Sequence, residues 1–218
     1  MGVLEADKIK REEMKEKLRM EYKRRVRKVL HSKLNGGNMV KVINTWAVSL
    51  LRYSAPFVNW TRSELKEMGR MTRKIMSMNR ALHPRDSVCR LYLSRKEGGR
   101  GLIGVEDCVD LAVLSLRRYA SQNEDRLIVA ARGNNMAARD KEEEFKKRKR
   151  EERKTEWREK PLHGQHLRQT ESISSEGSWL WLKIGKMKKE TEGLLIATQD
   201  QALRTNVIKT RIDKRPWG

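Results

Sequence analysis

Four glycines gather in LYLSRKEGGRGLIGVEDCV, residues 91–109, directly after a short apolar run. Within it, GRGLIG at 99–104 has the Gly-x-Gly-x-x-Gly spacing of a loop that cradles a dinucleotide phosphate. That interpretation needs a preceding strand inside a βαβ unit, and the preceding residues follow a helical pattern. The Gly-Lys-Ser/Thr of a P-loop does not follow either. We therefore predict a structural turn at Gly98, Gly99 and Gly101, because glycine permits positive φ and close approach between helices.

Acidic and imidazole side chains offer two further candidates for chemistry. Asp107 and Asp110 lie one helical turn apart beside the glycines and could hold a metal ion. Two aspartates in the first turn of a helix are better explained by the helix dipole. His163 and His166, in HGQH, would need metal ligands from elsewhere in the chain. The sequence thus predicts no metal site, no cofactor and no catalytic residue.

The charge of the chain indicates a polyanionic partner. Its 218 residues carry 50 Lys and Arg against 29 Asp and Glu, a net charge of +21. Such a surplus attracts nucleic acid first and an anionic membrane surface second. No apolar run approaches the ~20 residues of a membrane span, and we expect no membrane partner. The partners we expect are RNA, DNA or an RNA–DNA hybrid, and the pattern leaves the oligomeric state open.

The cysteines and one basic run bear on the compartment. Cys89 and Cys108 are the only cysteines, they stand in apolar contexts, and they form no CxxC motif. This usage is typical of an intracellular protein with reduced thiols. The run KKRKREERK at 146–154 resembles those read by nuclear import receptors, which favours a nuclear site, although ordinary solvated helices contain such runs too.

Apolar periodicity predicts a mainly α protein. Residues 5–34 form a long basic helix with one thin apolar stripe, ended by the glycines after Asn35. Asn38 is the expected N-cap of a core helix over 38–53 that includes Trp46. Thr61 and Glu64 form a capping box for a helix that ends before His83-Pro84. Further helices are expected over 86–95, with Asp86 as cap, and over 105–128.

The second half of the chain changes composition after Gly133. Residues 139–160 are almost all charged and predict either a long solvated helix or a disordered linker. Residues 161–178 predict a loop, and 194–208 predict a last helix. We therefore divide the chain into a basic N-terminal helix (1–36), a helical domain (37–133), a charged linker (134–178) and a C-terminal helical segment (179–218).

Residues 42–108, from VINTWAVSLLRYSAPFVNWT to RLYLSRKEGGRGLIGVEDC, resemble the thumb that follows the polymerase palm in reverse transcriptases of non-LTR retrotransposons. The closing TQDQALRTNVIKTRID resembles the segment before a CCHC zinc knuckle in the same family. The resemblance covers roughly residues 22–213, and its most specific blocks are GGRGL at 98–102 and QDQALRTN at 199–206.

This resemblance implies a thumb-like helical domain of an RNA-directed DNA polymerase. The palm aspartates, the knuckle cysteines and the endonuclease of that family have no counterpart in this sequence. We therefore expect a retroelement fragment that begins where the palm ends, stops where the knuckle would begin, and does not polymerise by itself. An enzyme whose palm comes from another chain stays as a less favoured possibility.

In the family, thumb helices grip the primer–template duplex through its backbone. The resemblance and the basic helical faces together give a set of candidate phosphate-binding residues: Arg62, Lys66, Arg70, Arg73 and Lys74 on the helix after the capping box, with Arg95, Lys96 and Arg100 at the turn. Tyr53 and Trp60 are candidates for stacking on bases, while Trp46 is expected in the core. The alternative function is a basic helical module that binds protein and has no nucleic-acid role.

Overall fold

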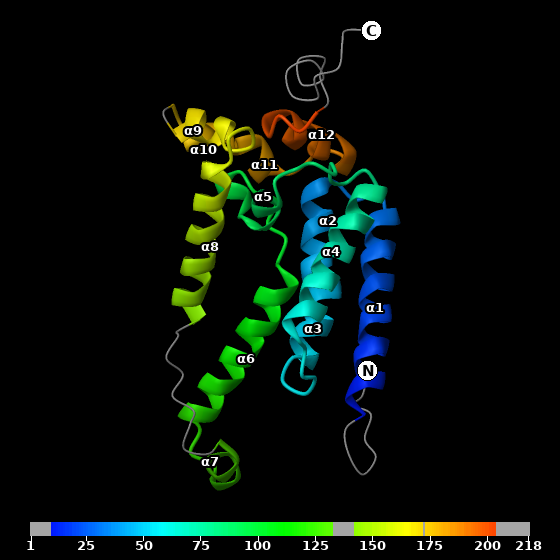
Figure 1. The fold of residues 1–218 in the computed structure, drawn as a ribbon, viewed down its shortest axis with the longest axis vertical. Helices are drawn as coiled ribbons and strands as arrows, with labels where there is room; N and C mark the ends of the chain where they lie inside the picture. The colour runs from blue at the N-terminus through cyan, green and yellow to red at the C-terminus, as the bar shows by residue number, and fades with distance from the viewer. Residues whose placement is uncertain (1–9, 133–141, 172, 204–218) are drawn as a thin grey trace.

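Figure 1 shows the computed structural model, which describes residues 10–132, 142–171 and 173–203. Every regular element within these ranges is a helix, and none of them is a strand, so the prediction of a mainly α fold is confirmed. The N-terminal helix α1 spans Arg11–His31. Helix α2 (Gly36–Val42), the π-helical turn η1 (Ile43–Ala47) and α3 (Val48–Ser54) follow one another without a break as one rod.

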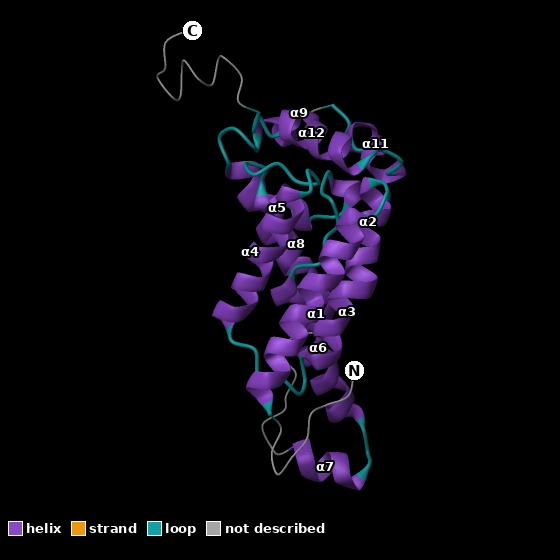
Figure 2. Cartoon of the chain, turned by 90° about the vertical axis from the view of Figure 1, so that its right-hand side faces the viewer, coloured by secondary structure: helices purple, strands orange, loops and turns teal. Residues whose placement is uncertain are grey.

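Two more long helices, α4 (Arg62–Met78) and α6 (Val105–Gln122), complete an irregular bundle. Helices α1 and α6 each pack against both α3 and α4. As a result, α3 and α4 lie on opposite sides of the bundle, which the two perpendicular views confirm (Figures 1 and 2). The outer faces of α3 and α4 therefore point in opposite directions.

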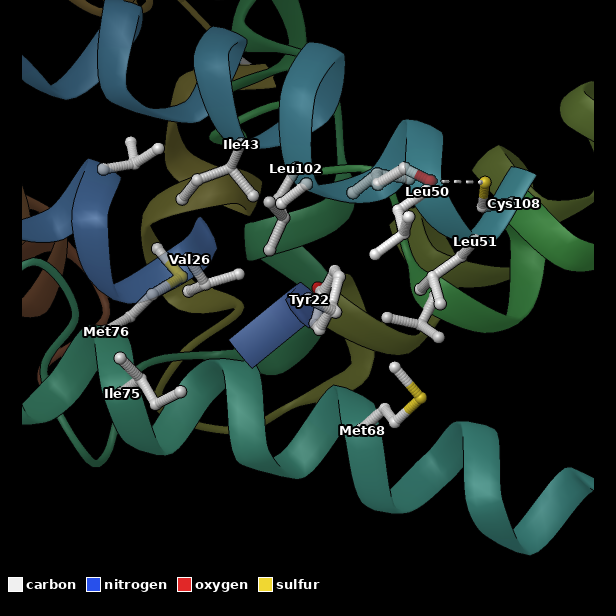
Figure 3. Close-up of a cluster of buried hydrophobic side chains, with 14 of the residues drawn as sticks. Tyr22, Val26, Ile43, Leu50, Leu51, Met68, Ile75, Met76, Leu102 and Cys108 are labelled. Carbon is white, nitrogen blue, oxygen red and sulfur yellow. Dashed lines mark hydrogen bonds between the residues drawn. The ribbon is translucent and has the colours of Figure 1, made fainter. Parts of the chain in front are cut away.

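Apolar side chains from α1, from the rod of α2, η1 and α3, and from α4 and α6 meet in one core (Figure 3). The stripe predicted for the first helix consists of Ile9, Met14, Leu18, Tyr22, Val26, Val29 and Leu34. Its members from Met14 to Val29 are buried, Leu34 is half-buried beyond the end of α1, and Ile9 lies outside the described residues. The predicted face of α4 is also buried, comprising Leu65, Met68, Thr72, Ile75 and Met76. Tyr22 of α1 and Thr72 of α4 share a hydrogen bond of 3.0 Å, so the one phenol in this core is satisfied.

The start of α4 agrees with its sequence signal. Thr61 Oγ1 accepts from the Glu64 N–H, and a Glu64 carboxylate oxygen accepts from the Thr61 N–H at 2.7 Å, which is the predicted capping box. Two of the N–H groups that a helix start leaves unpaired are satisfied in this way.

The junction between α1 and α2 differs from the sequence prediction. Helix α1 already ends at His31, and Asn35, not Asn38, is the N-cap of α2, because its side chain accepts from the Asn38 N–H at 2.8 Å. Gly36 is thus part of the new helix rather than a left-handed end of the old one. A Cβ at Gly36 would collide with the carboxylate of Glu192, so this glycine permits close approach of the C-terminal helices.

The π-helical turn η1 was not predicted, and it moves Trp46. A π-turn holds more residues than an α-turn, which shifts later side chains around the axis. Trp46 is exposed, so the prediction that it lies in the core was wrong. In the same turn, Asn44 donates to the carbonyl of Gly101 at 2.7 Å and accepts from the N–H of Ile103 at 2.9 Å. The turn therefore ties the rod to the glycine loop.

A group of short helices closes one end of the bundle (Figure 1). It consists of α5 (Val88–Tyr92), the 3₁₀ turn η2 (Arg95–Glu97), α9 (Gln165–Glu171), α10 (Ser175–Ser178), α11 (Leu180–Ile184) and α12 (Lys189–Gln199). Helix α8 (Glu142–Glu159) runs from this cap along α5 and α6. Helix α7 (Arg126–Arg132) lies at the opposite end.

The cap has its own apolar core, formed by Cys89, Leu93, Trp157, Leu167, Trp179, Leu182 and Ile196. The loop predicted over 161–178 is instead partly helical, because Leu167 of α9 is buried in this core. The N-cap residue of α5 is Ser87 rather than the predicted Asp86. The Asp86 carboxylate instead accepts from the His83 N–H at 3.0 Å. The last helix, predicted over 194–208, is observed as α12 and ends at Gln199. Residues 200–203 are therefore not helical as predicted, and 204–208 lie outside the described residues.

Candidate nucleic-acid interface

The outer face of α4 carries a row of lysine and arginine side chains spaced four residues apart. Lys66, Arg70 and Lys74 are exposed, and none of them forms an ion pair or side-chain hydrogen bond with another described residue. Residues four apart are neighbours on a helix surface, so these three charges form one continuous row. The row is held rigidly, because the opposite face of α4 is buried in the core.

The two other predicted basic residues of α4 are partly engaged. Arg62 donates to a carboxylate oxygen of Asp110 at 2.8 Å, and this contact raises the pKa of the guanidinium. Because Arg62 stays largely exposed, its pair with Asp110 contributes little to folding. Arg73 is half-buried and donates to the hydroxyl of Tyr92 at 2.9 Å. Both side chains nevertheless face the same groove as Lys66 and Arg70.

This groove lies between α4 and α8 and has a volume of about 820 Å³. Helix α8 contributes a second basic wall, with Arg148, Lys149 and Arg153. Acidic side chains neutralise part of this positive charge, because Lys149 pairs with Glu152 at 2.7 Å and Arg153 pairs with Asp107 of α6. The unpaired charges of the groove therefore lie on α4.

The predicted basic residues at the glycine loop behave differently from those on α4. Arg100 is buried, and its guanidinium contacts the Glu192 carboxylate and the carbonyl of Ala81. Arg95 donates to both carboxylate oxygens of Glu192, at 3.1 and 2.6 Å. The expectation that Arg95 and Arg100 are available for phosphate must be corrected, because the loop turns them inward onto α12. Lys96 alone of this group is exposed.

The backbone of the glycine loop is also committed internally. Gly98 and Gly101 adopt φ of 82° and 76°, which glycine alone accepts without strain. The N–H groups of residues 98–102 donate to the carbonyls of Arg95, Ser94, Arg90, Leu93 and Leu91, in that order. A phosphate-binding loop presents such groups to its ligand. Here they close a turn, and the dinucleotide interpretation of GRGLIG has no geometric support.

The acidic and imidazole candidates do not converge. Asp107 and Asp110 each pair with an arginine, and His166 lies edge-on to the Trp179 ring at 5.4 Å. Burial, as the largest cause, lowers the pKa of His163 and of His166. Within the described ranges, no group of three or more His, Cys, Asp or Glu side chains could hold a metal ion.

A buried ionic cluster joins the cap to the glycine loop, and sequence analysis missed it. Arg90 donates to the carboxylate of Asp200 at 2.8 Å and to the carbonyl of Gly98 at 2.7 Å. Its guanidinium lies 5.0 Å from the ring centroid of Trp157 and 5.3 Å from that of Trp179. Arg90 is thereby satisfied by charge, hydrogen bonds and two aromatic faces. A signal was present in CRLYL, where one arginine interrupts an apolar run.

The candidate stacking residues divide by exposure. Tyr53 is exposed on α3, whereas Trp60 is half-buried and packs against the main core. Trp60 is therefore a packing residue in this structure, whereas Tyr53 is exposed with its ring beside that of Phe57.

Comparisons with protein-family models, curated proteins and solved structures gave no match for this chain. Among the described helices, none is both long and apolar enough to span a bilayer. The function is therefore argued from the residues and their geometry.

Proposed function

We propose that this protein binds duplex nucleic acid, RNA or an RNA–DNA hybrid, through phosphate contacts along α4, and that binding rather than catalysis is its biochemical role. One observation carries the proposal: Lys66, Arg70 and Lys74 are exposed without a counter-charge among the described residues. Cations of this kind gain affinity for a polyanion by releasing its bound counterions. The net charge of +21 adds long-range attraction.

The geometry of the row suits a backbone contact. From Lys66 to Lys74 the helix axis advances by about 12 Å, since each residue adds about 1.5 Å. One strand of an A-form duplex places a phosphate about every 3 Å along its axis, slightly closer than in B-form DNA, so the row spans about four phosphates. Contacts to phosphates carry no sequence information of their own, and we expect little sequence preference.

The resemblance of residues 42–108 to a reverse-transcriptase thumb supports the same proposal. In that family, thumb helices hold the primer–template duplex by its backbone, and α4 corresponds to the thumb-like helix of the resemblance. We propose that the chain is the thumb and linker part of a non-LTR retrotransposon reverse transcriptase. The proposal concerns binding only.

The test is the affinity for a labelled RNA–DNA hybrid across a salt series. With about four contacts from α4, since Arg62 is paired with Asp110, the logarithm of affinity should fall with the logarithm of salt with a slope of about −4. The variant Lys66→Glu plus Arg70→Glu should bind more weakly, with a slope shallower by about two. These two side chains make no native ion pair among the described residues, so the variant should fold normally.

The matched control is Lys183→Glu plus Lys186→Glu, which changes net charge equally at exposed positions of the cap outside the groove. It should keep the wild-type slope. An affinity that does not depend on salt, or equal losses in the two double variants, would contradict a site on α4.

A second candidate function, protein binding, is favoured by exposed apolar side chains in the C-terminal half of α6 and on α7. Leu116 and Tyr119 of α6 and Leu127 of α7 are exposed. Contiguous exposed apolar residues are typical of interaction surfaces. Heparin separates the two candidates, because it should displace nucleic acid from a basic surface and leave a protein partner bound to an apolar one.

A further inference from the structure

The rod formed by η1 and α3 exposes three aromatic rings on the side of the bundle away from α4. Trp46, Tyr53 and Phe57 are 37%, 55% and 45% exposed. Positions seven apart share a helix face, which places Tyr53 near the line of Trp46. Phe57 follows in the next turn, and its ring centroid lies 6.2 Å from that of Tyr53. We call these three residues the aromatic stripe.

The rings of the stripe do not belong to the core-facing side of the rod. Between residues 45 and 57, every aliphatic side chain is buried: Ala47, Val48, Leu50, Leu51 and Ala55. The exposed positions of this segment are the three rings with Thr45, Arg52 and Pro56. Flat aromatic rings are the side chains on which unpaired bases stack. Here the exposed apolar atoms belong almost entirely to flat rings.

An arginine accompanies the rings. The guanidinium of Arg25, from α1, lies 5.3 Å from the centroid of the Trp46 ring. It is fixed there by hydrogen bonds of 2.8 Å to the Glu21 carboxylate and 2.8 Å to the carbonyl of Trp46. On the rod itself, Arg52 is exposed but directs its side chain toward Cys108 of α6, so Arg25 is the arginine that lies at the rings. Rings interleaved with cations are what unpaired nucleotides require, because bases stack on the rings while phosphates meet the cations.

We propose that the aromatic stripe binds single-stranded nucleic acid by base stacking on Trp46, Tyr53 and Phe57, with Arg25 beside the strand's backbone. This surface is separate from the proposed duplex site, because α3 and α4 lie on opposite sides of the bundle (Figure 2). The two surfaces would let one protein hold a duplex on one side and an unpaired strand on the other. The inference does not depend on the duplex proposal.

The test uses a fluorescently labelled oligo-dT, which forms no duplex, and the variant Tyr53→Ala plus Phe57→Ala. Alanine substitution of a stacking ring costs about five-fold or more in affinity for each base, so the double variant should bind at least about 25-fold more weakly. Tyr53→Phe keeps the ring and should bind like the wild type. Tyr119→Ala removes an equally exposed ring from α6 and should also have no effect.

The duplex proposal is distinguished in the same experiment. Tyr53→Ala plus Phe57→Ala should keep the wild-type salt slope for the RNA–DNA hybrid, whereas Lys66→Glu plus Arg70→Glu should keep the ring-dependent loss for oligo-dT. Unchanged oligo-dT affinity in the ring variant overturns the stripe while leaving the duplex site intact. Binding to phosphatidylserine vesicles that is lost in the ring variant, with oligo-dT binding unaffected, would assign the stripe to a membrane surface and also overturn the proposal.

Discussion

Arg90 and Asp200 form an ion pair of 2.8 Å although 110 residues separate them in the chain, and both side chains are buried. The pair joins α5, next to the glycine loop, to the end of α12. Desolvation, as the largest cause, lowers the pKa of Arg90, while the Asp200 carboxylate raises it. The cap therefore depends on one carboxylate to keep this charge buried.

The first prediction concerns that carboxylate. Asp200→Asn keeps the shape of the side chain but leaves the Arg90 charge without its counter-ion, and the free energy of unfolding should fall by about 3 kcal/mol. Urea denaturation measures this change. Asp110→Asn is the matched control, because its partner Arg62 is largely exposed, and it should cost less than about 1 kcal/mol. Equal effects of the two substitutions would show that the buried ion pair does not stabilise the cap more than an exposed pair does.

A second prediction concerns pH and Asp86. Burial, as the largest cause, and the nearby Asp200 charge raise the pKa of the Asp86 carboxyl from 3.8 to about 7, although the His83 N–H and the charges of Arg100 and Arg90 oppose the shift. The folded protein thus binds this proton more tightly than the unfolded chain does. The contribution of Asp86 to stability is complete below about pH 4 and is lost as the pH rises through 7, on the order of 4 kcal/mol.

Denaturation of the wild type and of Asp86→Asn between pH 5 and 8 tests this sign. The amide does not ionise, so the variant should lose this fall in stability and exceed the wild type at the upper end of the range. The imidazole of His83 lies 4.0 Å from Asp86, and burial lowers the pKa of His83. His83 therefore lowers the stability of the folded protein as the pH falls, opposite to the effect of Asp86. Parallel pH profiles for the two proteins would mean that Asp86 is ionised throughout.

Two glycines give opposite predictions for the same substitution. Gly98 has φ of 82°, and a Cβ there would lie 2.6 Å from the indole of Trp179, so Gly98→Ala should cost at least about 2 kcal/mol. Gly69 lies inside α4, where a Cβ would have its nearest neighbour at 3.6 Å. Gly69→Ala should stabilise the protein by about 1 kcal/mol, because alanine favours the helix more than glycine does. Thermal melts of the two variants give the comparison, and a stabilised Gly98→Ala would refute the packing of the loop on Trp179.

Local signals were sufficient to predict much of the bundle. Helix α4 follows from a capping box and a regular apolar face, and both are present in the structure. The α1 stripe is similar: Leu18, Tyr22 and Val26 recur every four residues and are buried. In these elements, the residues that determine the structure lie within one or two turns of one another.

Long-range pairing was beyond the reach of such signals. Arg95 and Arg100 resemble surface cations in sequence, because their common partner, Glu192, is more than 90 residues away. In the same way, the dense charge of 142–159 concealed Trp157, whose buried ring anchors α8 in the cap. The prediction that Arg95 and Arg100 are available for phosphate failed for this reason, while the exposed row on α4 needed no distant partner.

The last prediction follows from the acids that line the groove. Asp110 neutralises Arg62 at the start of the basic row, with an N–O distance of 2.8 Å. Asp110→Asn should release Arg62 for a phosphate and remove a repulsive charge, so affinity for the RNA–DNA hybrid should rise several-fold at low salt. The salt slope should steepen by about one, because one more phosphate contact forms. Asp125→Asn, at an exposed position near the start of α7, is the control for net charge and should leave the slope unchanged. A gain in affinity that is equal in both variants would mean that overall charge, rather than the groove beside α4, determines binding.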